Sequence, residues 1–380
     1  MGTLSGLVLL GGLGRAVTGA VDAPLPMDAP EPDLWTAHRG GPSQQGIART
    51  PVADSLSLVW SFAASGPIES SPVIAEGSVW VGSADGHVYS VDLESGQRRW
   101  ARDVGAPVSA SPLVLGDALY VGDEDGFFHC LGAADGQSRW KIETRGKIAG
   151  AANWIPRDST PVVVFGSYDG KLRSVDAKTG ATLWEFGIEN YIHGTPAVWK
   201  GSVVFGGCDG WLHVVSGDDG ISQGKCRVEG QVGASAAVAA GVAYFGTYEG
   251  VMTAVDLATL KVAWIYRDRA LPYVSSAAVN ESLIVVGSRD RRVDCIDRTT
   301  GERLWVARTR GRVDGSPVVT GDRALVGCDD GRLYLLRLED GGEVWSYDLG
   351  APIRTTPAIA AGRVVVGGSD GRLHCFRGAS

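Results

Sequence analysis

The sequence predicts a single all-β domain: one eight-bladed β-propeller of four-stranded antiparallel blades, closed by an N-terminal strand that completes the last blade. Three observations predict it. A module of about forty residues recurs eight times, a tryptophan recurs at one place within it, and a strand that the last module lacks stands near the opposite end of the chain. The residue after the acidic residue of a tight turn marks the repeat, at positions 86, 126, 170, 210, 250, 291, 331 and 371.

The first module shows what each copy contains. Its strand-like runs cover residues 68–74, 78–82, 87–92 and 97–102. Asp85-Gly86 is a hairpin signal between the second and third runs, and the segment from Asp92 to Gly96 is a second turn with a side-chain acceptor for backbone amides. Four strands joined in an up-and-down meander make one propeller blade.

The tryptophan register counts the blades. It comprises Trp60, Trp100, Trp140, Trp184, Trp264, Trp305 and Trp345, and Gly224 stands where an eighth tryptophan belongs. A large flat ring at a fixed place on the outer strand predicts packing between neighbouring blades, with the indole N–H bound to a carbonyl. We therefore expect these residues to be structural docking positions, and the joint at Gly224 to be looser.

Ring closure follows from the two ends of the array. The eighth module ends at Phe376 without a tryptophan strand, and an orphan strand of that kind lies at 56–62. Pairing the two gives a propeller over 56–377 and leaves no open sheet edges. Upstream, residues 1–20 read as a candidate signal peptide, 21–34 as a proline-rich linker, and 35–55 as an irregular leader over one face or flank of the ring.

Charge and cysteine usage exclude several classes of protein. The net charge of −8 and the absence of a basic run argue against a nucleic-acid or anionic-membrane surface, and no segment is long enough to span a bilayer. The six cysteines show no disulfide framework and the histidines no metal-ligand spacing, so we expect no metal and no cofactor. The signal-like start favours a periplasmic or secreted protein, whereas free packing thiols favour the alternative, a cytoplasmic one.

Several short motifs resemble a known family. Ser-Ser-Pro-Val at 70–73, Val-Gly-Ser-x-Asp-Gly at 81–86 and Val-Asp-x-x-x-Gly-x-x-x-Trp at 91–100 are similar to the pyrroloquinoline-quinone-type (PQQ-like) propeller repeat. Quinone-dependent alcohol dehydrogenases and periplasmic BamB-type outer-membrane assembly lipoproteins share that repeat. The uniform modules and the Trp-x-x-x-Arg-Gly-x-Pro leader at 35–42 look most like the non-catalytic, BamB-like branch.

What the resemblance implies for activity is limited by two departures. The dehydrogenases place a pair of adjacent cysteines against the quinone and carboxylates on a calcium ion, and this sequence has no Cys-Cys pair. The assembly lipoproteins carry a lipidated cysteine after the signal, and here no cysteine follows Leu9-Leu-Gly-Gly-Leu13. Fold alone does not assign function, so neither activity transfers intact.

A candidate ligand site lies at the mouth of the central channel. One variable residue per blade precedes the small residues of the first strand, and these residues include Glu69, His193, Asp314 and Arg354. We expect Glu69, Arg354 and Asp314 to cluster, with His193 across the opening, so that Arg354 holds a polar or anionic ligand between two carboxylates. The alternative is a rim of solvated charges that contributes little.

A candidate partner surface lies on the same face, at the tips of the hairpins between second and third strands. Its residues are Tyr168, Tyr191, Trp211, Tyr248 and Arg289. Aromatic side chains and arginine are enriched at protein interfaces, although isolated exposed aromatics on loops are also ordinary. With no catalytic set visible, we expect a non-enzymatic scaffold for protein interaction or assembly; the alternative is a propeller that binds a small molecule or quinone.

Overall fold

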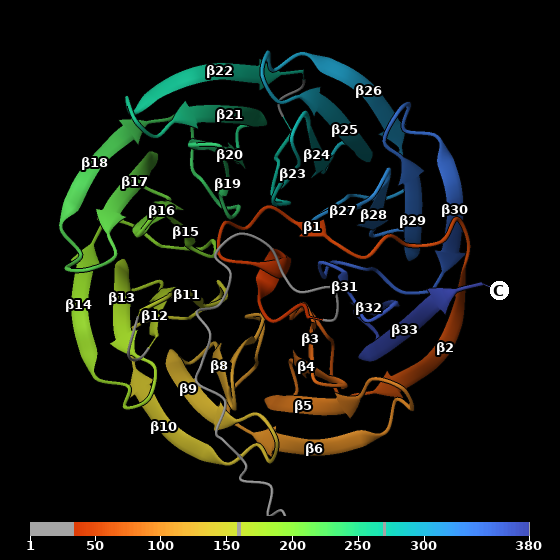
Figure 1. Cartoon of the computed structure of the whole chain (residues 1–380), viewed down its shortest axis with the longest axis horizontal. Helices are drawn as coiled ribbons and strands as arrows, with labels where there is room; N and C mark the ends of the chain where they lie inside the picture. The colour runs from red at the N-terminus through yellow and green to blue at the C-terminus, as the bar shows by residue number, and fades with distance from the viewer. Residues whose placement is uncertain (1–33, 158–160, 269–270, 380) are drawn as a thin grey trace, which may run out of the picture.

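A ring of eight four-stranded blades is what the computed structural model shows for residues 34–157, 161–268 and 271–379, which it describes (Figure 1). The predicted fold class is confirmed. The candidate signal peptide at 1–20 and nearly all of the linker at 21–34 lie outside the described residues. Within them, no helix has the length and apolarity needed to cross a membrane.

Each blade is an antiparallel meander that runs outward from the axis. Blades one to four comprise β3 (Val73–Ala75), β4 (Ser78–Gly82), β5 (His87–Asp92), β6 (Arg98–Asp103); β7 (Leu113–Leu115), β8 (Ala118–Gly122), β9 (Phe127–Gly132), β10 (Ser138–Glu143); β11 (Asn153–Ile155), β12 (Val162–Gly166), β13 (Lys171–Asp176), β14 (Thr182–Gly187); and β15 (Ala197–Trp199), β16 (Ser202–Gly206), β17 (Trp211–Ser216), β18 (Ser222–Arg227). Blades five to eight comprise β19 (Ala237–Ala239), β20 (Val242–Gly246), β21 (Val251–Asp256), β22 (Lys261–Arg267); β23 (Ala278–Val279), β24 (Leu283–Ser288), β25 (Arg292–Asp297), β26 (Arg303–Arg308); β27 (Val318–Thr320), β28 (Arg323–Gly327), β29 (Arg332–Arg337), β30 (Glu343–Asp348); and β31 (Ala358–Ala360), β32 (Arg363–Gly367), β33 (Arg372–Gly378), β2 (Leu56–Ala63).

The orphan strand closes the ring as predicted. β2 is the outermost strand of blade eight and pairs antiparallel with β33, with Trp60 opposite Cys375 and Phe62 opposite Leu373. The first and last strands of the propeller therefore share one sheet, and no blade is left without an outer strand.

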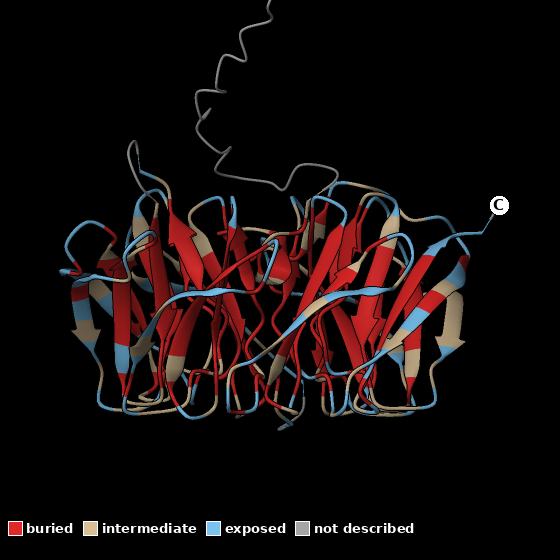
Figure 2. Cartoon of the chain, turned by 90° about the horizontal axis from the view of Figure 1, so that it is seen from below, coloured by how far each residue is buried: buried red, intermediate tan, exposed pale blue. Residues whose placement is uncertain are grey.

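The core lies between blades rather than within them. Inner strands are buried on both faces, whereas outer strands alternate between buried and exposed residues (Figure 2). A glycine ends the second strand of seven blades and stands one residue before the end of β24 in blade six, and a Cβ there would overlap the apolar residue that precedes the first strand of the next blade. Gly82 of blade one faces Val108 of blade two in this way, and the same contact recurs around the ring as far as Gly367 of blade eight, which faces Ile68 of blade one. Contact between backbone and side chain at this point sets how closely neighbouring blades approach.

The register tryptophans lie at the outer joints between blades. Six of the seven donate an indole N–H bond of 2.7–3.2 Å to a carbonyl of the next blade. The first of these bonds joins Trp60 to the Leu93 carbonyl and the last joins Trp305 to the Leu338 carbonyl. Each of these six rings also lies against the glycine of the next blade's outer turn, as Trp60 lies against Gly96. At the joint after blade four the pair is inverted, because Leu260 replaces the glycine and its side chain fills the space beside Gly224.

The structure places the leader on the ring axis. It contains the short 3₁₀ helix η1 (His38–Gly40) and β1 (Ile47–Ala48), which pairs in parallel with β27 (Figure 1). Its backbone carbonyls accept amide N–H bonds from the innermost strands of six blades in turn; the donors are Ile74, Val114, Val198, Val238, Val279 and Val319. The leader therefore supplies the acceptors that the innermost strands need on their axial side.

Candidate functional site: the channel mouth and the axial cavity

Hairpin tips and mouth residues meet on one face of the ring. The tip residue of one blade contacts the mouth residue of the next blade, twenty-five positions later in sequence. This holds for Tyr168 and His193, Arg289 and Asp314, and Asp329 and Arg354. The predicted ligand residues and partner residues thus belong to one continuous rim.

One side of the rim is a chain of ion pairs. Both Nε and Nη2 of Arg289 donate to the Asp314 carboxylate at 2.9–3.2 Å, and hydrogen bonding to Asp314 raises the pKa of Arg289. Nε of Arg354 donates to Oδ1 of Asp329 at 2.9 Å, while its Nη1 lies 3.7 Å from Oε1 of Glu69. Arg354 is therefore shared between Asp329 and Glu69, and its charge also interacts with Asp314, whose hydrogen bonds come from Arg289. Glu69, Arg354 and Asp314 thus lie on one side of the rim, but Asp329 rather than Asp314 holds the Arg354 guanidinium.

The other side of the rim is aromatic. The Tyr168 hydroxyl lies 2.5 Å from Nδ1 of His193, and the ring of Tyr168 stacks on Tyr191 with centroids 4.8 Å apart and planes inclined by 20°. Burial raises the pKa of Tyr168 to about 12 and, with a smaller effect of the Lys147 charge, lowers the pKa of His193. Tyr168 is thus a neutral phenol between the partly buried imidazole of His193 and the exposed ring of Tyr191.

The remaining aromatic candidates occupy different surroundings. The ring of Tyr248 lies over Gly233, where a Cβ would overlap it, so Tyr248 covers part of the mouth. Trp211, at the start of β17, lies against the cations of the outer strand β18, with Nζ of Lys225 4.3 Å and the guanidinium of Arg227 5.3 Å from its ring centroid. The aromatic patch at the mouth is therefore Tyr168, Tyr191 and Tyr248.

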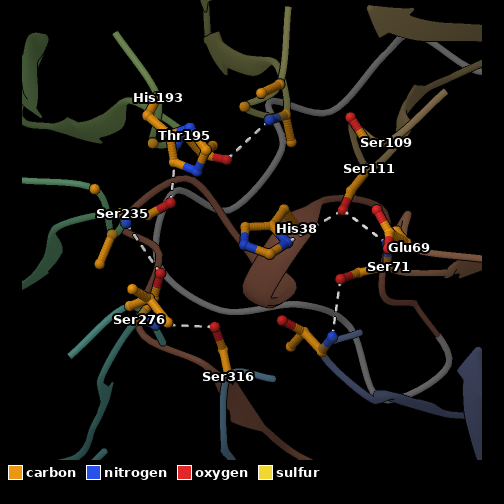
Figure 3. Close-up of a pocket in the computed structure, with 18 of the residues that line it drawn as sticks. His38, Glu69, Ser71, Ser109, Ser111, His193, Thr195, Ser235, Ser276 and Ser316 are labelled. Atoms are coloured by element: carbon orange, nitrogen blue, oxygen red, sulfur yellow. Dashed lines mark hydrogen bonds between the residues drawn. The ribbon is translucent and has the colours of Figure 1, made fainter. Parts of the chain in front are cut away.

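Below the mouth, an axial cavity of about 160 Å³ is lined by hydroxyl groups (Figure 3). Seven blades contribute a serine or threonine at the start of the first strand: Ser71, Ser111, Thr195, Ser235, Ser276, Ser316 and Thr356. Six inter-blade bonds of 2.9–3.1 Å run around the ring, each from the backbone N–H at this position of one blade to the hydroxyl oxygen of the next. Ala151 is the one position of this ring without a hydroxyl.

The leader forms the floor of the cavity. His38 lines it, and its Nδ1 lies 3.3 Å from the Ser111 hydroxyl. The buried guanidinium of Arg39 donates to four backbone carbonyls, those of Gln44, Gln45, Ala277 and Pro317. Burial lowers the pKa of Arg39 to about 9, so its guanidinium remains a cation at neutral pH.

Sequence reasoning did not identify His38, Arg39, Asp329 or the hydroxyl ring as site residues. A signal was present for two of them. Serine or threonine occupies the same module position in seven of eight blades, and Asp329 stands twenty-five residues before a cation, as Arg289 stands before an anion. The leader offered no such signal because its position rests on backbone carbonyls.

The partly buried histidine of the floor predicts acid-dependent stability. Burial, assisted by the Arg39 charge, lowers the pKa of His38 from 6.5 to about 3. Between these values the unfolded chain binds a proton that the native state does not, so stability is complete above pH 6.5 and falls as the pH decreases towards 3. The slope is at most about 1.4 kcal/mol per pH unit for this group. In urea unfolding at pH 7.5 and 5.0, we expect His38→Gln to lose less stability between the two pH values than the wild type; an equal loss would show that His38 is not buried in neutral form.

The residues around the cavity do not fit a pyrroloquinoline quinone site. A volume of about 160 Å³ is below the range of roughly 300–1,000 Å³ that larger ligands occupy. No group of three His, Cys, Asp or Glu side chains in the described ranges has the arrangement of a metal site. The hairpin carboxylates are held by other protein groups, as Asp85 is by the Ser65 amide and the Tyr89 hydroxyl at 2.9 and 2.7 Å.

Comparison with known proteins agrees with this geometry. No curated protein matches the sequence. Among solved structures, BamB from Moraxella catarrhalis is 20% identical, with 85% of this chain and 98% of that chain covered and a TM-score of 0.71. The computationally designed Ika8 protein is 18% identical, with 84% and 99% covered and a TM-score of 0.74. Quinohemoprotein alcohol dehydrogenase from Comamonas testosteroni is 13% identical, with 92% and 81% covered and a TM-score of 0.76.

At these identities the solved structures share the fold alone. The family model described as outer membrane protein assembly factor BamB matches residues 52–167, 84–220, 168–289 and 289–379. These overlapping matches run through all eight blades and confirm the resemblance predicted from the repeat motifs. The chain therefore belongs to the family described as outer membrane protein assembly factor BamB.

Proposed function

We propose that this chain is a non-catalytic scaffold that docks a protein partner on the face of the ring that carries the channel mouth. The observation that supports it best is Tyr191, which is 51% exposed and yet held flat on Tyr168, itself fixed by His193. An exposed aromatic ring that is already ordered loses little conformational entropy when a partner covers it.

The paired charges beside this patch suit a docking role. Arg289 and Asp314 are joined across two blades, and Arg354 bridges Asp329 and Glu69. Such a rim gives orientation and specificity more than affinity. The family description, an outer membrane protein assembly factor, supports a protein partner and an exported, periplasmic location over a cytoplasmic one.

Site-specific photocrosslinking in cells tests the proposal. A photoreactive residue at Tyr191 should give an adduct of one defined mass, whereas the same residue at Lys178 should not. Lys178 is a matched control because it belongs to the same blade and is exposed, but lies in the outer turn between β13 and β14, at the opposite edge of the sheet.

Replacement of Tyr168 with alanine should reduce the Tyr191 adduct about tenfold or more, as expected for a hot-spot residue whose truncation costs at least about 1.4 kcal/mol. An adduct that forms equally at both sites, or that is insensitive to Tyr168→Ala, would refute docking on the mouth face. The quinone-binding alternative is not favoured, because its representatives match by fold alone and the cavity does not accommodate the cofactor.

A further inference from the structure

The hydroxyl ring of the axial cavity has hydrogen-bond donors left over. Each hydroxyl that accepts an amide N–H from the neighbouring blade still carries its own hydrogen. Among the described residues, the hydrogens of Thr195, Ser235, Ser276 and Ser316 find no protein acceptor, although these side chains are 3–7% exposed and line the cavity. These donors therefore face the enclosed space.

Adjacent hydroxyls in the same strands behave differently. Ser275 precedes Ser276, and its hydroxyl donates to the Gly287 carbonyl and accepts from the Gly287 amide, both at 2.9 Å. The Thr355 hydroxyl likewise donates to the Gly367 carbonyl and accepts from the Gly367 amide. The Ser70 hydroxyl accepts from the Gly82 amide of its own blade and donates to the Ala110 carbonyl of the next blade. The first hydroxyl of each such pair is thus satisfied by protein, and the second is directed to the axis.

A cation lies directly behind this ring. The guanidinium of Arg39 donates to the carbonyls of Ala277 and Pro317, the residues that follow Ser276 and Ser316. In the described part of the chain, no carboxylate lies within ion-pair distance of Arg39, and the acceptors of its hydrogen bonds are all backbone carbonyls. An uncompensated charge in surroundings of low dielectric attracts an anion more strongly than the same charge in water.

The upper part of the cavity also carries charge. Glu69 is the carboxylate of the lining, half exposed at the mouth and 3.7 Å from Arg354. The Ser109 hydroxyl, beside it in the lining, is buried without a hydrogen-bond partner among the described residues. Negative charge is therefore confined to the mouth, and the deep end is donor-rich and positive.

We propose that the deep end of the axial cavity, at the level of Ser276 and Ser316, binds a small anion: an inorganic anion or a carboxylate group. The hydroxyl hydrogens supply the direct contacts, and Arg39 supplies the charge. The cavity has room for about five water molecules, so a small anion enters with part of its hydration shell. The inference does not depend on the docking surface proposed above.

Calorimetric titration and thermal unfolding of the full chain with sodium formate, sodium sulfate and sodium iodide, at constant ionic strength, test the proposal. We expect saturable binding and a rise in Tm of about 4 °C at a hundredfold excess over Kd. Crystals soaked in iodide should show an anomalous peak on the axis beside Ser276 and Ser316. If none of the three anions gives a saturable effect, the hydroxyls are solvated by water alone and the proposal is wrong.

Matched variants separate binding from stability. Ser276→Ala/Ser316→Ala removes two donors and should weaken the anion Kd at least about tenfold, whereas Ser275→Ala should leave the Kd unchanged. Both proteins lose inter-strand or inter-blade bonds, so the readout is the Kd and not the starting Tm. An equal Kd in these two variants would overturn the assignment. Glu69→Gln should bind the anion more tightly, because a repulsive charge is removed, and weaker binding in that variant would also overturn the assignment.

Competition against iodide identifies the source of the anion. A short peptide with a free C-terminal carboxylate that competes, when its amidated form does not, would assign the site to a carboxylate carried by a partner. Competition by formate but not by the peptide would assign it to a free anion. A peptide amide that competes as well as the free acid would contradict anion recognition.

Discussion

Trp60→Ala should destabilise the protein by about 3–5 kcal/mol, the largest effect that we expect from a single substitution. Trp60 is 9% exposed on β2, the strand that closes the ring, and its indole N–H donates to the Leu93 carbonyl at 2.9 Å. Its ring also covers Gly96 of blade one. The substitution opens a cavity and removes a hydrogen bond at the one joint where the two ends of the propeller array meet.

Trp345→Ala is the matched control. Trp345 occupies the same module position on β30 of blade seven. The outer strand of blade eight is the N-terminal strand β2, so blade eight has no turn between its third and fourth strands and no turn glycine faces this ring. It packs instead on Tyr347 and Phe376, with centroids 6.0 and 5.9 Å away. In urea denaturation we expect Trp345→Ala to lose clearly less stability than Trp60→Ala. Equal losses would show that the indole–turn contact contributes little beyond burial of the ring.

The fold could be predicted because its information is periodic. A forty-residue step and one tryptophan per step determine the number of blades, and the missing tryptophan strand after Phe376 determines how the ring closes. The position of the leader could not be predicted in this way. Its contacts are carbonyls that accept amides from successive blades, and every residue except proline offers the same backbone groups.

The candidate site was partly predictable, and the difference in hydrogen-bond partners has a specific cause. Sequence reasoning placed Arg354 between Glu69 and Asp314 because these residues occupy neighbouring mouth positions. Each hairpin tip, however, reaches the mouth position of the next blade, so Arg289 takes Asp314 and Asp329 takes Arg354. The charges alternate in sign at a separation of twenty-five residues, which a comparison of the two rings in the sequence would have revealed.

The inverted joint between blades four and five gives a prediction of coupling. Gly224 of blade four stands where other blades have tryptophan, and Leu260 of blade five stands where other blades have the turn glycine. The side chain of Leu260 lies against Gly224. The missing tryptophan by itself predicts a looser joint, and the structure shows why that expectation fails: Leu260 of blade five lies against Gly224. The leucine fills the space that the indole ring occupies elsewhere, so each residue of the pair is explained by the other.

Gly224→Trp alone should destabilise the protein by about 1–3 kcal/mol, because the new ring overlaps Leu260 in a packed joint. Leu260→Gly alone should also destabilise it, since the side chain that fills the joint is lost, although it relieves a positive φ of 53° at a leucine. Together the two substitutions recreate the pair of Trp184 and Gly220 at the preceding joint, where the indole N–H donates to the Gly217 carbonyl at 3.0 Å.

The double variant should therefore be more stable than the sum of the two single changes by about 1–3 kcal/mol. A double-mutant cycle from urea denaturation midpoints measures that coupling energy directly. Gly224→Trp with Leu257→Ala serves as a control, because Leu257 packs in the same interblade cluster but does not occupy the turn position of the glycine. Additive effects in the Leu260 cycle would mean that the two departures from the repeat arose without compensating each other, and that the joint tolerates an empty space where the other blades place an indole ring.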